Sequence, residues 1–301
     1  MTELRRTQLA VPASDERMMA NAADSDADEV FLDLEDSVAP NAKAEAREPL
    51  VAAAKEHDWS DKVLSYRING VDTRWWYDDV IEVVSEAGEY IDDIIVPKVP
   101  NASELQTVDD LVTQVEVNND LEVGGIGLEP QIEDGEGMHN VHEIAHSTDR
   151  LSVLIFGPGD YAAAMGTPGL DIGQFPDYPG HYWHHALSEC NAAAKSAGVP
   201  CTDGPYADID DSEGFRTSAE RANMLGCDGK WAIHPSQIEI ANEVFAPDPE
   251  VAERAKRIVD AYAEAMAEGK GAVSVDGQMV DEATNKMAQD IVEKAEAAGI
   301  L

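Results

Sequence analysis

Polar side chains recur where short apolar runs end, and their types suit metal-assisted chemistry. In chain order they are Asp33, Glu35, Asp36, Arg67, Asn69, Lys98, Glu133, Asp160, Asp203 and His234. A charge directly after an apolar strand is not expected of a merely solvated surface group, so position marks these residues. Glu133 and Asp160 offer carboxylate oxygens from adjacent strands, and Mg²⁺ prefers such ligands together with waters and substrate oxygens. Arg67 is a permanent cation that can hold a carboxylate or a developing oxyanion.

Structural explanations remain open for these residues at this point. Glu133 and Asp160 can equally cap helices or form salt bridges, and Arg67 can simply pair with Asp33 or Glu35. The Gly-Pro-Gly stretch just before Asp160 lets a backbone approach a ligand closely, but such a stretch more often only makes a turn.

A second pattern belongs to a different kind of site. The segment from His142 to His146 reads His-Glu-Ile-Ala-His and matches the zinc-protease motif, with both imidazoles on one helix face. The positions where the extended motif would supply a third ligand are Asp149 and Ser152. The segment also lies just before a predicted strand, inside a strand–helix unit. We interpret it as a chance match, with a zinc hydrolase as the alternative.

Short apolar runs alternate with amphipathic stretches up to about residue 245, as in repeated strand–helix units. The predicted strands are Thr7–Val11, Glu29–Leu34, Val63–Ile68, Ile91–Val96, Glu122–Gln131, Leu151–Phe156, Val199–Thr202 and Lys230–Ile233. Helical patterns between them include Ala42–Lys55, Trp75–Ala87, Ser103–Val117, His181–Ala197 and Ser212–Leu225. These alternations predict a TIM (β/α)8 barrel of the α/β class, with a doubly wound sheet as the alternative. In a barrel the polar residues above share the rim where active sites lie.

The chain changes character after Phe245. Asp248–Gly269 has a long helical pattern, Ala272–Val275 is strand-like, and a last helix runs to about Ala298. We therefore predict a catalytic barrel over residues 1–246 and a C-terminal extension over residues 247–301. The extension is too short for a core of its own, so it must pack on the barrel or on a neighbouring subunit.

The amino-acid composition excludes some classes of binding partner. The chain of 301 residues has 60 Asp and Glu against 21 Lys and Arg, which gives a net charge of −39. This charge excludes a general role in binding nucleic acid and opposes docking on an anionic membrane. Acids spread over the whole chain are typical of a halophilic protein, because the Debye length shrinks to about 3 Å at 1 M salt. We find no signal peptide and no membrane-spanning run, so we expect a cytoplasmic protein.

The three cysteines do not suggest a site. Cys190, Cys201 and Cys227 are odd in number and lack the spacing of a zinc motif, so we expect reduced thiols in or near the core.

Read in order, the motifs resemble the citrate lyase β-subunit-like (HpcH/HpaI aldolase) superfamily. They are Leu32-Asp-Leu-Glu-Asp-Ser-Val-Ala-Pro40 with Lys43 and Arg47, Arg67-Ile-Asn-Gly70, Pro97-Lys98, Pro130-Gln-Ile-Glu133, Phe156-Gly-Pro-Gly-Asp160 and Gly229-Lys-Trp-Ala-Ile-His-Pro235. Further segments resemble its malyl-CoA/β-methylmalyl-CoA lyase branch, namely Trp75-Trp-Tyr77, Asp203-Gly-Pro205, Asp211-Ser-Glu-Gly-Phe215, Ala241-Asn-Glu-Val-Phe245 and Gly277-Gln-Met-Val-Asp281. The resemblance covers nearly the whole chain.

This resemblance implies an Mg²⁺-dependent carbon–carbon lyase, with Mn²⁺ as the alternative metal. Its reversible Claisen reaction would cleave L-malyl-CoA to acetyl-CoA and glyoxylate, and β-methylmalyl-CoA to propionyl-CoA and glyoxylate. It implies that Glu133 and Asp160 hold the metal, that Arg67 binds substrate, and that Asp281 is an acid/base on a lid over a neighbouring subunit. Lys98 would also contact substrate, and the chain would form a homotrimer or homohexamer.

The acids Asp33, Glu35 and Asp36 would complete the network at the rim. The alternatives within and beyond this branch are a citramalyl-CoA lyase, a malyl-CoA thioesterase or malate synthase-like relative, and a citrate lyase β subunit.

One loop departs from the family pattern. The first loop usually reads Pro-Gly-Ser/Asn-Arg-Pro and helps to hold the phosphates of coenzyme A. Here it reads Pro12-Ala-Ser-Asp-Glu-Arg17, with acids in place of the Gly-Arg step. Only Arg17, with Arg5 or Arg6, remains as a nearby cation for those phosphates.

Overall fold

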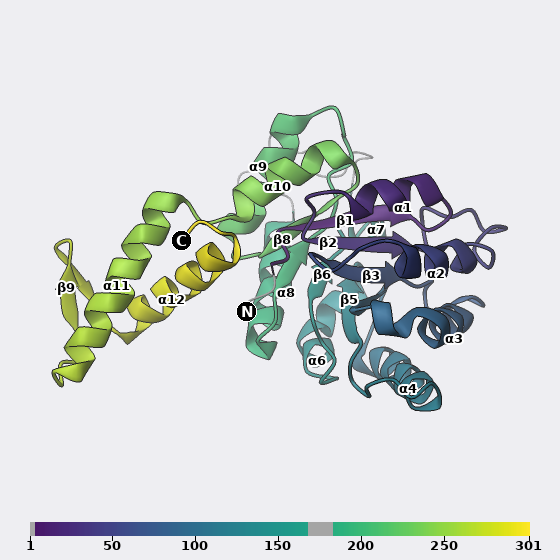
Figure 1. The fold of residues 1–301 in the computed structure, drawn as a ribbon, viewed down its shortest axis with the longest axis horizontal. Helices are drawn as coiled ribbons and strands as arrows, with labels where there is room; N and C mark the ends of the chain where they lie inside the picture. The colour runs from purple at the N-terminus through teal and green to yellow at the C-terminus, as the bar shows by residue number, and fades with distance from the viewer. Residues whose placement is uncertain (1–3, 168–182) are drawn as a thin grey trace. The chain divides into compact units, whose positions relative to one another are not determined.

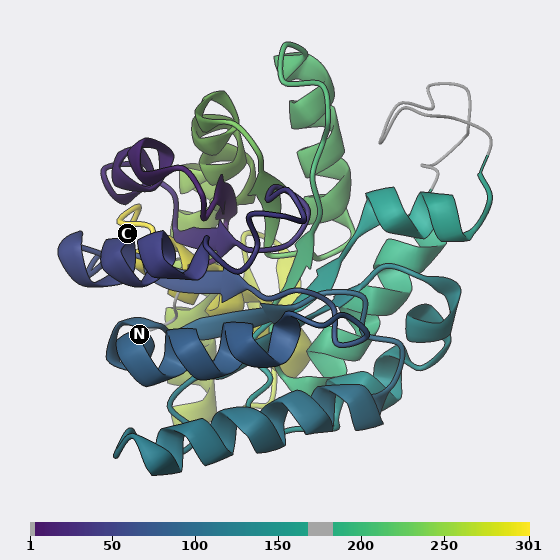
Figure 2. The same ribbon diagram turned by 90° about the vertical axis from the view of Figure 1, so that its right-hand side faces the viewer.

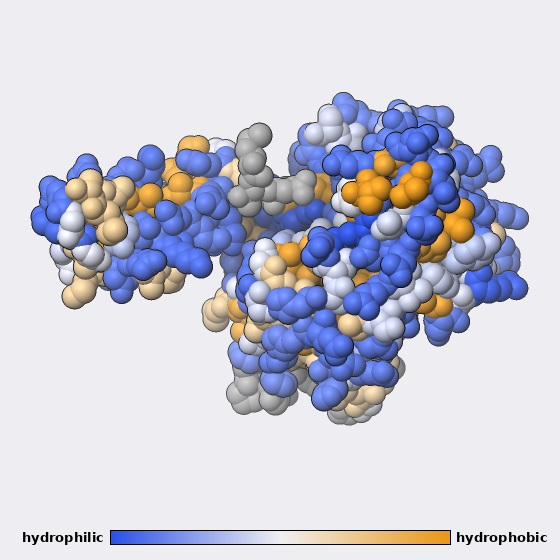
Figure 3. Space-filling view, turned by 90° about the horizontal axis from the view of Figure 1, so that it is seen from below, coloured by the Kyte–Doolittle hydropathy of each residue, from blue (hydrophilic) through white to orange (hydrophobic). Residues whose placement is uncertain are grey.

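The computed structural model describes residues 4–167 and 183–301. The chain divides into two compact units, a larger one over Arg5–Asn242 and a smaller one that includes Glu243–Leu301. None of the described helices is long and apolar enough to cross a membrane. On the face drawn in Figure 3, hydrophilic residues predominate and apolar residues form separate patches.

Eight parallel strands close into a barrel in the larger unit, in the order β1 to β8 (Figure 1). They are β1 (Thr7–Pro12), β2 (Glu29–Asp33), β3 (Val63–Arg67), β4 (Asp93–Val96), β5 (Gly127–Ile132), β6 (Leu154–Phe156), β7 (Cys201–Asp203) and β8 (Gly229–Ala232). The TIM-type barrel predicted from the alternating pattern is confirmed, and the doubly wound sheet is wrong because β1 pairs with β8.

Helices follow the strands on the outside of the barrel, and Figure 2 shows α2, α3 and α4 side by side. The helices of this unit are α1 (Glu16–Ala23), α2 (Arg47–Glu56), α3 (Trp76–Ala87), α4 (Ala102–Asn118), α5 (Gly135–His139), α6 (Val141–Ala145), α7 (Pro158–Ala164), α8 (His184–Ala197) and α9 (Ser212–Met224), with 3₁₀ turns η1 (Gly88–Tyr90) and η2 (Pro235–Gln237). Helix α10 (Ile238–Phe245) runs on from η2.

Two predicted boundaries are wrong by five residues, and the strand predicted from Leu151 starts three residues later, at Leu154. The strand expected from Glu122 starts at Gly127, because turns after α4 occupy residues 119–126. The helix expected from Ala42 starts at Arg47, because Lys43 is used to hold the preceding loop: its ammonium donates to the carbonyls of Leu34 and Glu35. The start of the helix predicted from His181 lies outside the described residues.

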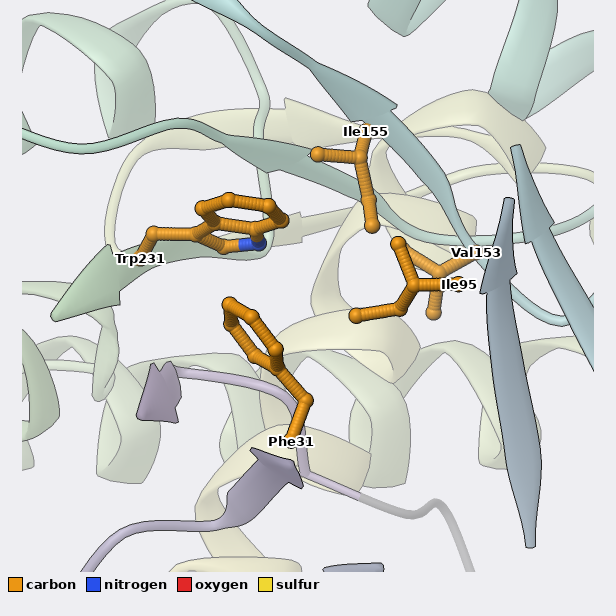
Figure 4. Packing of buried hydrophobic residues seen from close by; sticks show 5 residues of the cluster. All are labelled: Phe31, Ile95, Val153, Ile155 and Trp231. Carbon is orange, nitrogen blue, oxygen red and sulfur yellow. The ribbon is translucent and has the colours of Figure 1, made fainter. Parts of the chain in front are cut away.

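An apolar layer fills the middle of the barrel. Phe31, Ile95, Ile155 and Trp231 come from β2, β4, β6 and β8 and meet at the axis together with Val153 (Figure 4). Alternate strands contribute to one layer, as expected for this type of barrel. The rings of Phe31 and Trp231 lie 4.5 Å apart, so an aromatic floor closes the barrel beneath the rim.

The opposite end of the barrel holds a buried charged network. Arg5 donates to Glu29 and Glu129 at 2.8 and 2.6 Å and to Asp93 at 2.6 Å. Glu29 and Asp93 are the first residues of their strands, so this network lies at the N-terminal end. Arg6 pairs with Asp28 at the same end. Arg5 and Arg6 are therefore far from the rim, and the expectation that either remains near the phosphates of coenzyme A is wrong.

The smaller unit consists of two helices and a hairpin: α11 (Pro249–Ala267), β9 (Val273–Val275), β10 (Gln278–Val280) and α12 (Glu282–Ala297). The sequence predicted both helices and β9 but not β10. Asp276 and Gly277 both have positive φ, 48° and 79°, which is the turn that joins two strands of a tight hairpin. The buried side chains of α11 and α12 are alanines, which allows the helices to approach closely.

Candidate active site

The last residues of β2 and β3 form a two-point ion pair. Asp33 and Arg67 are partners in the strand register, and the Nε and Nη2 groups of Arg67 each donate to Asp33 at 2.7 Å. Burial favours the neutral acid, but the guanidinium beside it outweighs burial and lowers the pKa of Asp33 to about 2. The guanidinium also lies 5.4 Å from the ring centre of Trp231 and 5.9 Å from that of Phe31. Arg67 is therefore a fixed cation on the aromatic floor.

Glu35 bridges Arg67 to a second cation. Its Oε2 lies 3.0 Å from Nη1 of Arg67, and its Oε1 accepts from the ammonium of Lys98. Burial raises the pKa of Glu35 even though both cations oppose that shift. Asp36 is 61% exposed and lies 3.9 Å from both cations. Asp33, Arg67, Glu35, Lys98 and Asp36 thus form a continuous chain of charges.

Lys98 organises the site with its backbone as well as its side chain. It follows β4 in the left-handed region, at φ 53°, which is uncommon for a residue other than glycine. In this conformation its N–H donates to Oε1 of Glu133 at 2.8 Å, while its ammonium lies 3.5 Å from Asp160. The amide of Gln131 donates to the other oxygen of Glu133 at 2.8 Å. Two donors therefore fix the Glu133 carboxylate.

Glu133 and Asp160 follow neighbouring strands, β5 and β6. Glu133 is only 3% exposed, whereas the side chain of Asp160, in the first turn of α7, is 47% exposed. Burial raises the pKa of Glu133 to about 8, although Lys98 opposes the shift. A Cβ on Gly157 would lie 2.6 Å from Oε2 of Glu133, so only glycine lets the β6–α7 turn pass over this carboxylate. The Gly-Pro-Gly stretch is thus part of the site and starts α7 at Pro158.

These side chains open into one cavity of about 540 Å³ at the C-terminal end of the barrel. Its lining includes Asp33, Asp36, Arg67, Glu133 and Asp160. A second cavity of about 420 Å³ shares Lys98, Glu133 and Asp160 with it. The volume is in the range of small-ligand sites. The site therefore offers a fixed cation facing two carboxylates across a space that holds a small molecule.

Three of the polar residues marked by the sequence lie elsewhere. Asn69 donates to Asp79, which ties the loop after β3 to α3. Asp203 is buried and accepts from Lys230, its register partner on β8. His234 accepts the N–H of Ser236 at the start of η2. Each of these side chains supports the fold, because its partner is another structural element.

Asp281 belongs to the smaller unit, where it is the N-cap of α12. Its Oδ1 accepts the N–H and the hydroxyl of Thr284, each at 3.0 Å. The hydrogen bond from this backbone N–H lowers the pKa of the exposed carboxyl. The acid is therefore ionised at neutral pH, and Thr284 holds it in one orientation.

The two imidazoles of the histidine motif contact different residues of α8. His142 lies 3.0 Å from Glu189 and His146 lies 3.0 Å from Ser196, so both exposed rings contact α8. Among residues 4–167 and 183–301, no group of three or more His, Cys, Asp or Glu side chains could hold a metal ion. The interpretation of the motif as a chance match agrees with this arrangement. Cys190, Cys201 and Cys227 are free and buried.

Sequence reasoning missed Ala10, Gln131 and Trp231 in the lining of the main cavity. Ala10 and Trp231 lie within predicted strands and are not polar strand ends, and at the end of the fifth strand Glu133 was expected to carry the chemistry in place of Gln131. The signal that finds them is the alternation of inward- and outward-facing residues along each strand.

Comparison with known proteins assigns the family. The family model described as HpcH/HpaI aldolase/citrate lyase matches residues 6–235. The chain is 42% identical to the L-malyl-CoA/β-methylmalyl-CoA lyase of Rhodobacter capsulatus, over 99% of this chain and 96% of the relative. It is 34% identical to the citrate lyase subunit β of Leuconostoc mesenteroides subsp. cremoris, over 98% of this chain and 94% of that protein.

A solved structure shows the same relationship. The structure of CitE from Mycobacterium tuberculosis in complex with magnesium, acetoacetate and coenzyme A is 27% identical, with a TM-score of 0.75. The match covers 96% of this chain and 97% of that one. The relatives found by sequence are named lyases over nearly their full length. The chain therefore belongs to the HpcH/HpaI aldolase/citrate lyase family and is an enzyme of the carbon–carbon lyase class.

Proposed function

We propose that this protein is an Mg²⁺-dependent lyase that cleaves L-malyl-CoA to acetyl-CoA and glyoxylate, and β-methylmalyl-CoA to propionyl-CoA and glyoxylate. The observation that carries the proposal is the pair Glu133 and Asp160 opposite the fixed cation Arg67 in one cavity. The names of the relatives at 42% identity support this substrate class. The reaction is reversible Claisen chemistry.

The residues present fit a magnesium ion. Glu133 and Asp160 are hard oxygen ligands, and Oε1 of Gln131 is buried beside them without a hydrogen-bond partner among the described residues. Two protein carboxylates leave the other positions of an octahedral ion to waters and substrate oxygens. When bound, Mg²⁺ supplies Lewis-acid polarisation of the glyoxylate aldehyde oxygen. The bound magnesium of the CitE structure supports the same metal here.

Arg67 is suited to the thioester oxygen. A guanidinium has five N–H donors, and two of those on Arg67 are committed to Asp33. One N–H of Nη2 and the N–H groups of Nη1, which also lies 3.0 Å from Glu35, remain for substrate. Asp33 and the aromatic floor fix the position of the guanidinium. A cation held in this way stabilises the enolate oxygen without reorganising during the reaction.

The proton at the carbon next to the thioester needs a base. In the condensation direction we assign this role to Asp281, which takes the proton from the acyl-CoA. The enolate then forms the new carbon–carbon bond at the aldehyde carbon of glyoxylate, and the resulting alkoxide takes a proton from solvent. Cleavage follows the same steps in reverse. Asp281 would act from a lid over a neighbouring subunit in a homotrimer or homohexamer, so a base would arrive only when the site closes.

Two exposed arginines are candidates for the phosphates of coenzyme A. Arg17 lies in the first turn of α1, and Arg74 lies in the loop between β3 and α3. Neither forms an ion pair with any carboxylate that the structure describes. The guanidinium of Arg74 lies 4.9 Å from the ring centre of Trp75. Both connections lie at the C-terminal end of the strands, as the cavity does.

The experiment uses the purified protein with Mg²⁺ at high salt. Incubation with L-malyl-CoA is expected to release glyoxylate and acetyl-CoA in equal amounts. No release above background contradicts the proposal. The same assay with β-methylmalyl-CoA and citramalyl-CoA ranks the thioesters, and a free-thiol assay detects a malyl-CoA thioesterase. Release that requires an added acyl-carrier partner indicates a citrate lyase β subunit instead.

A further inference from the structure

The cavity has an apolar side that the proposed chemistry leaves unused. Its charged residues are the last residues of β2 and β3 and residues of the connections that follow β2, β5 and β6. Another side, formed by β1, α1, the loop after β7, and β8 with the residue that follows it, is apolar. It is lined by Ala10, Val11, Pro12, Met18, Pro205, Trp231 and Ile233. An apolar wall in a polar site selects an apolar group of the ligand.

The strand register shows why this side is deep. In a closed barrel of this type each layer rises by one residue from strand to strand. Applied to the observed pairs, this rise places four inward-facing positions directly above the aromatic floor: Ala10, Arg67, Gln131 and Gly204. Arg67 and Gln131 are long, whereas Ala10 and Gly204 are the smallest residues. Arg67 and Gln131 therefore fill the layer on the side of β3 and β5. Pro158 fills it beside Gly204, where an added Cβ would lie 2.3 Å from Cδ of that proline. The layer is open at Ala10 of β1, which lines the cavity.

Ala10 decides how far the space reaches. It pairs with Phe31 in the register and packs against the layer that contains Phe31 and Trp231. At position 10 only a methyl group projects from the strand, and Trp231 of the floor itself lines the cavity. A longer side chain at position 10 would occupy the part of the cavity beside Trp231, in the same layer as Arg67.

We propose that Ala10 and Trp231 form a pocket for a substituent on the carbon next to the thioester, and that Ala10 sets its size. The proposal rests on the function proposed above, because it places the thioester oxygen on Arg67. With that oxygen on Arg67 and glyoxylate at Glu133 and Asp160, the reacting carbon lies between them. Its substituent then faces the open side of the layer. The enzyme accordingly accepts acyl groups longer than propionyl, such as butyryl.

The test compares acetyl-CoA, propionyl-CoA and butyryl-CoA in condensation with glyoxylate. For the unaltered protein, kcat/KM for butyryl-CoA is expected to lie within about tenfold of that for acetyl-CoA, because one apolar group changes specificity by roughly 10- to 200-fold when a pocket rejects it. Ala10→Leu is expected to lower the butyryl-to-acetyl ratio by at least about tenfold. Ala10→Gly is expected to preserve or raise this ratio.

Ala192→Leu is the matched control, since it makes the same substitution at an exposed position of α8. Its ratio is expected to stay unchanged. Rejection of butyryl-CoA by the unaltered protein, or an unchanged ratio in Ala10→Leu, overturns the proposal. If Ala10→Leu does not fold, the butyryl-to-acetyl ratio of kcat/KM is measured in Ala10→Val in its place.

The failure of the proposed function is a separate outcome. If acetyl-CoA and glyoxylate do not condense, the lyase assignment fails. Calorimetry then tests the pocket without turnover. It compares the affinities of the Mg²⁺-loaded Ala10→Leu and Ala10→Gly variants for butyryl-CoA and for acetyl-CoA. A preference for acetyl-CoA in Ala10→Leu alone supports it, and equal preferences in both variants overturn it.

Discussion

Replacing Asp33 with Asn tests the claim that this acid fixes Arg67. The pKa of Asp33 falls from 3.8 to about 2 in the folded protein. At about 1.4 kcal/mol for each pH unit, this difference corresponds to roughly 2 kcal/mol of stability at neutral pH. Little of it is lost to solvent screening, since Asp33 is only 2% exposed. We expect Asp33→Asn to lower the free energy of unfolding by about this amount.

The pH dependence gives the sign of the effect. Because the folded pKa is lowered, the stabilisation is present above pH 3.8 and disappears as the pH falls through about 2. The stability difference between Asp33→Asn and the unaltered protein should therefore be the same at pH 7 and at pH 5 and smaller at pH 3. Urea unfolding at constant high salt measures it.

Asp36→Asn is the control for this measurement, because it makes the same substitution three residues after the end of β2. Asp36 is 61% exposed and lies 3.9 Å from Arg67, so its loss should change stability by less than about 0.5 kcal/mol. Asp33→Asn should also lower turnover, because Arg67 loses its anchor. An effect below about 0.5 kcal/mol at pH 7, or one that grows as the pH falls, would refute the reasoning.

Four further predictions address the metal, the base, the coenzyme and the solvent. Glu133→Gln should weaken Mg²⁺ binding at least about a hundredfold, measured by calorimetry without substrate. Even the loss of a residue that only hydrogen-bonds to a metal ligand lowers the affinity 10- to 100-fold. An unaltered affinity would place the metal elsewhere. Asp281→Asn should leave folding and Mg²⁺ binding intact while lowering turnover by roughly 10²- to 10⁴-fold, and unchanged turnover would remove Asp281 from the mechanism. Arg74→Ala should raise KM for the thioester about tenfold with little change in kcat, whereas Arg221→Ala, which removes an exposed cation in the last turn of α9, should change neither. Lowering KCl from 1 M to 0.1 M lengthens the Debye length from about 3 to about 10 Å, so a chain of charge −39 should lose thermal stability, and an unchanged Tm would contradict a halophilic origin.

The strands and part of the rim could be predicted from the sequence because apolar runs mark buried strands and the residues that end them share one face. Asp33 and Arg67 are last in their strands and meet as register partners. Asp203 also ends a strand but points outward, because Gly204 occupies the inward-facing position. The end of each strand in the sequence was therefore sufficient to predict which residues lie near the rim. Whether a side chain points into the barrel or outward could be seen only from the strand register.

Other features depend on contacts that no local pattern contains. The left-handed backbone at Lys98 is stabilised by its hydrogen bond to Glu133, which is 35 residues away in the sequence. The role of Gly157 follows from the position of that same carboxylate. Ala10 is an ordinary strand residue until the barrel closes and places it beside Trp231. Tertiary contacts define these parts of the site.

The central claim is that Glu133 and Asp160 hold Mg²⁺ while Arg67 binds the thioester oxygen. A crystal structure obtained with Mg²⁺, glyoxylate and acetyl-CoA tests it most directly. The account predicts a metal with oxygens of Glu133 and Asp160 at about 2.0–2.1 Å and a donor of Arg67 on the thioester oxygen. A metal bound elsewhere, or a thioester oxygen with no contact to Arg67, would contradict it.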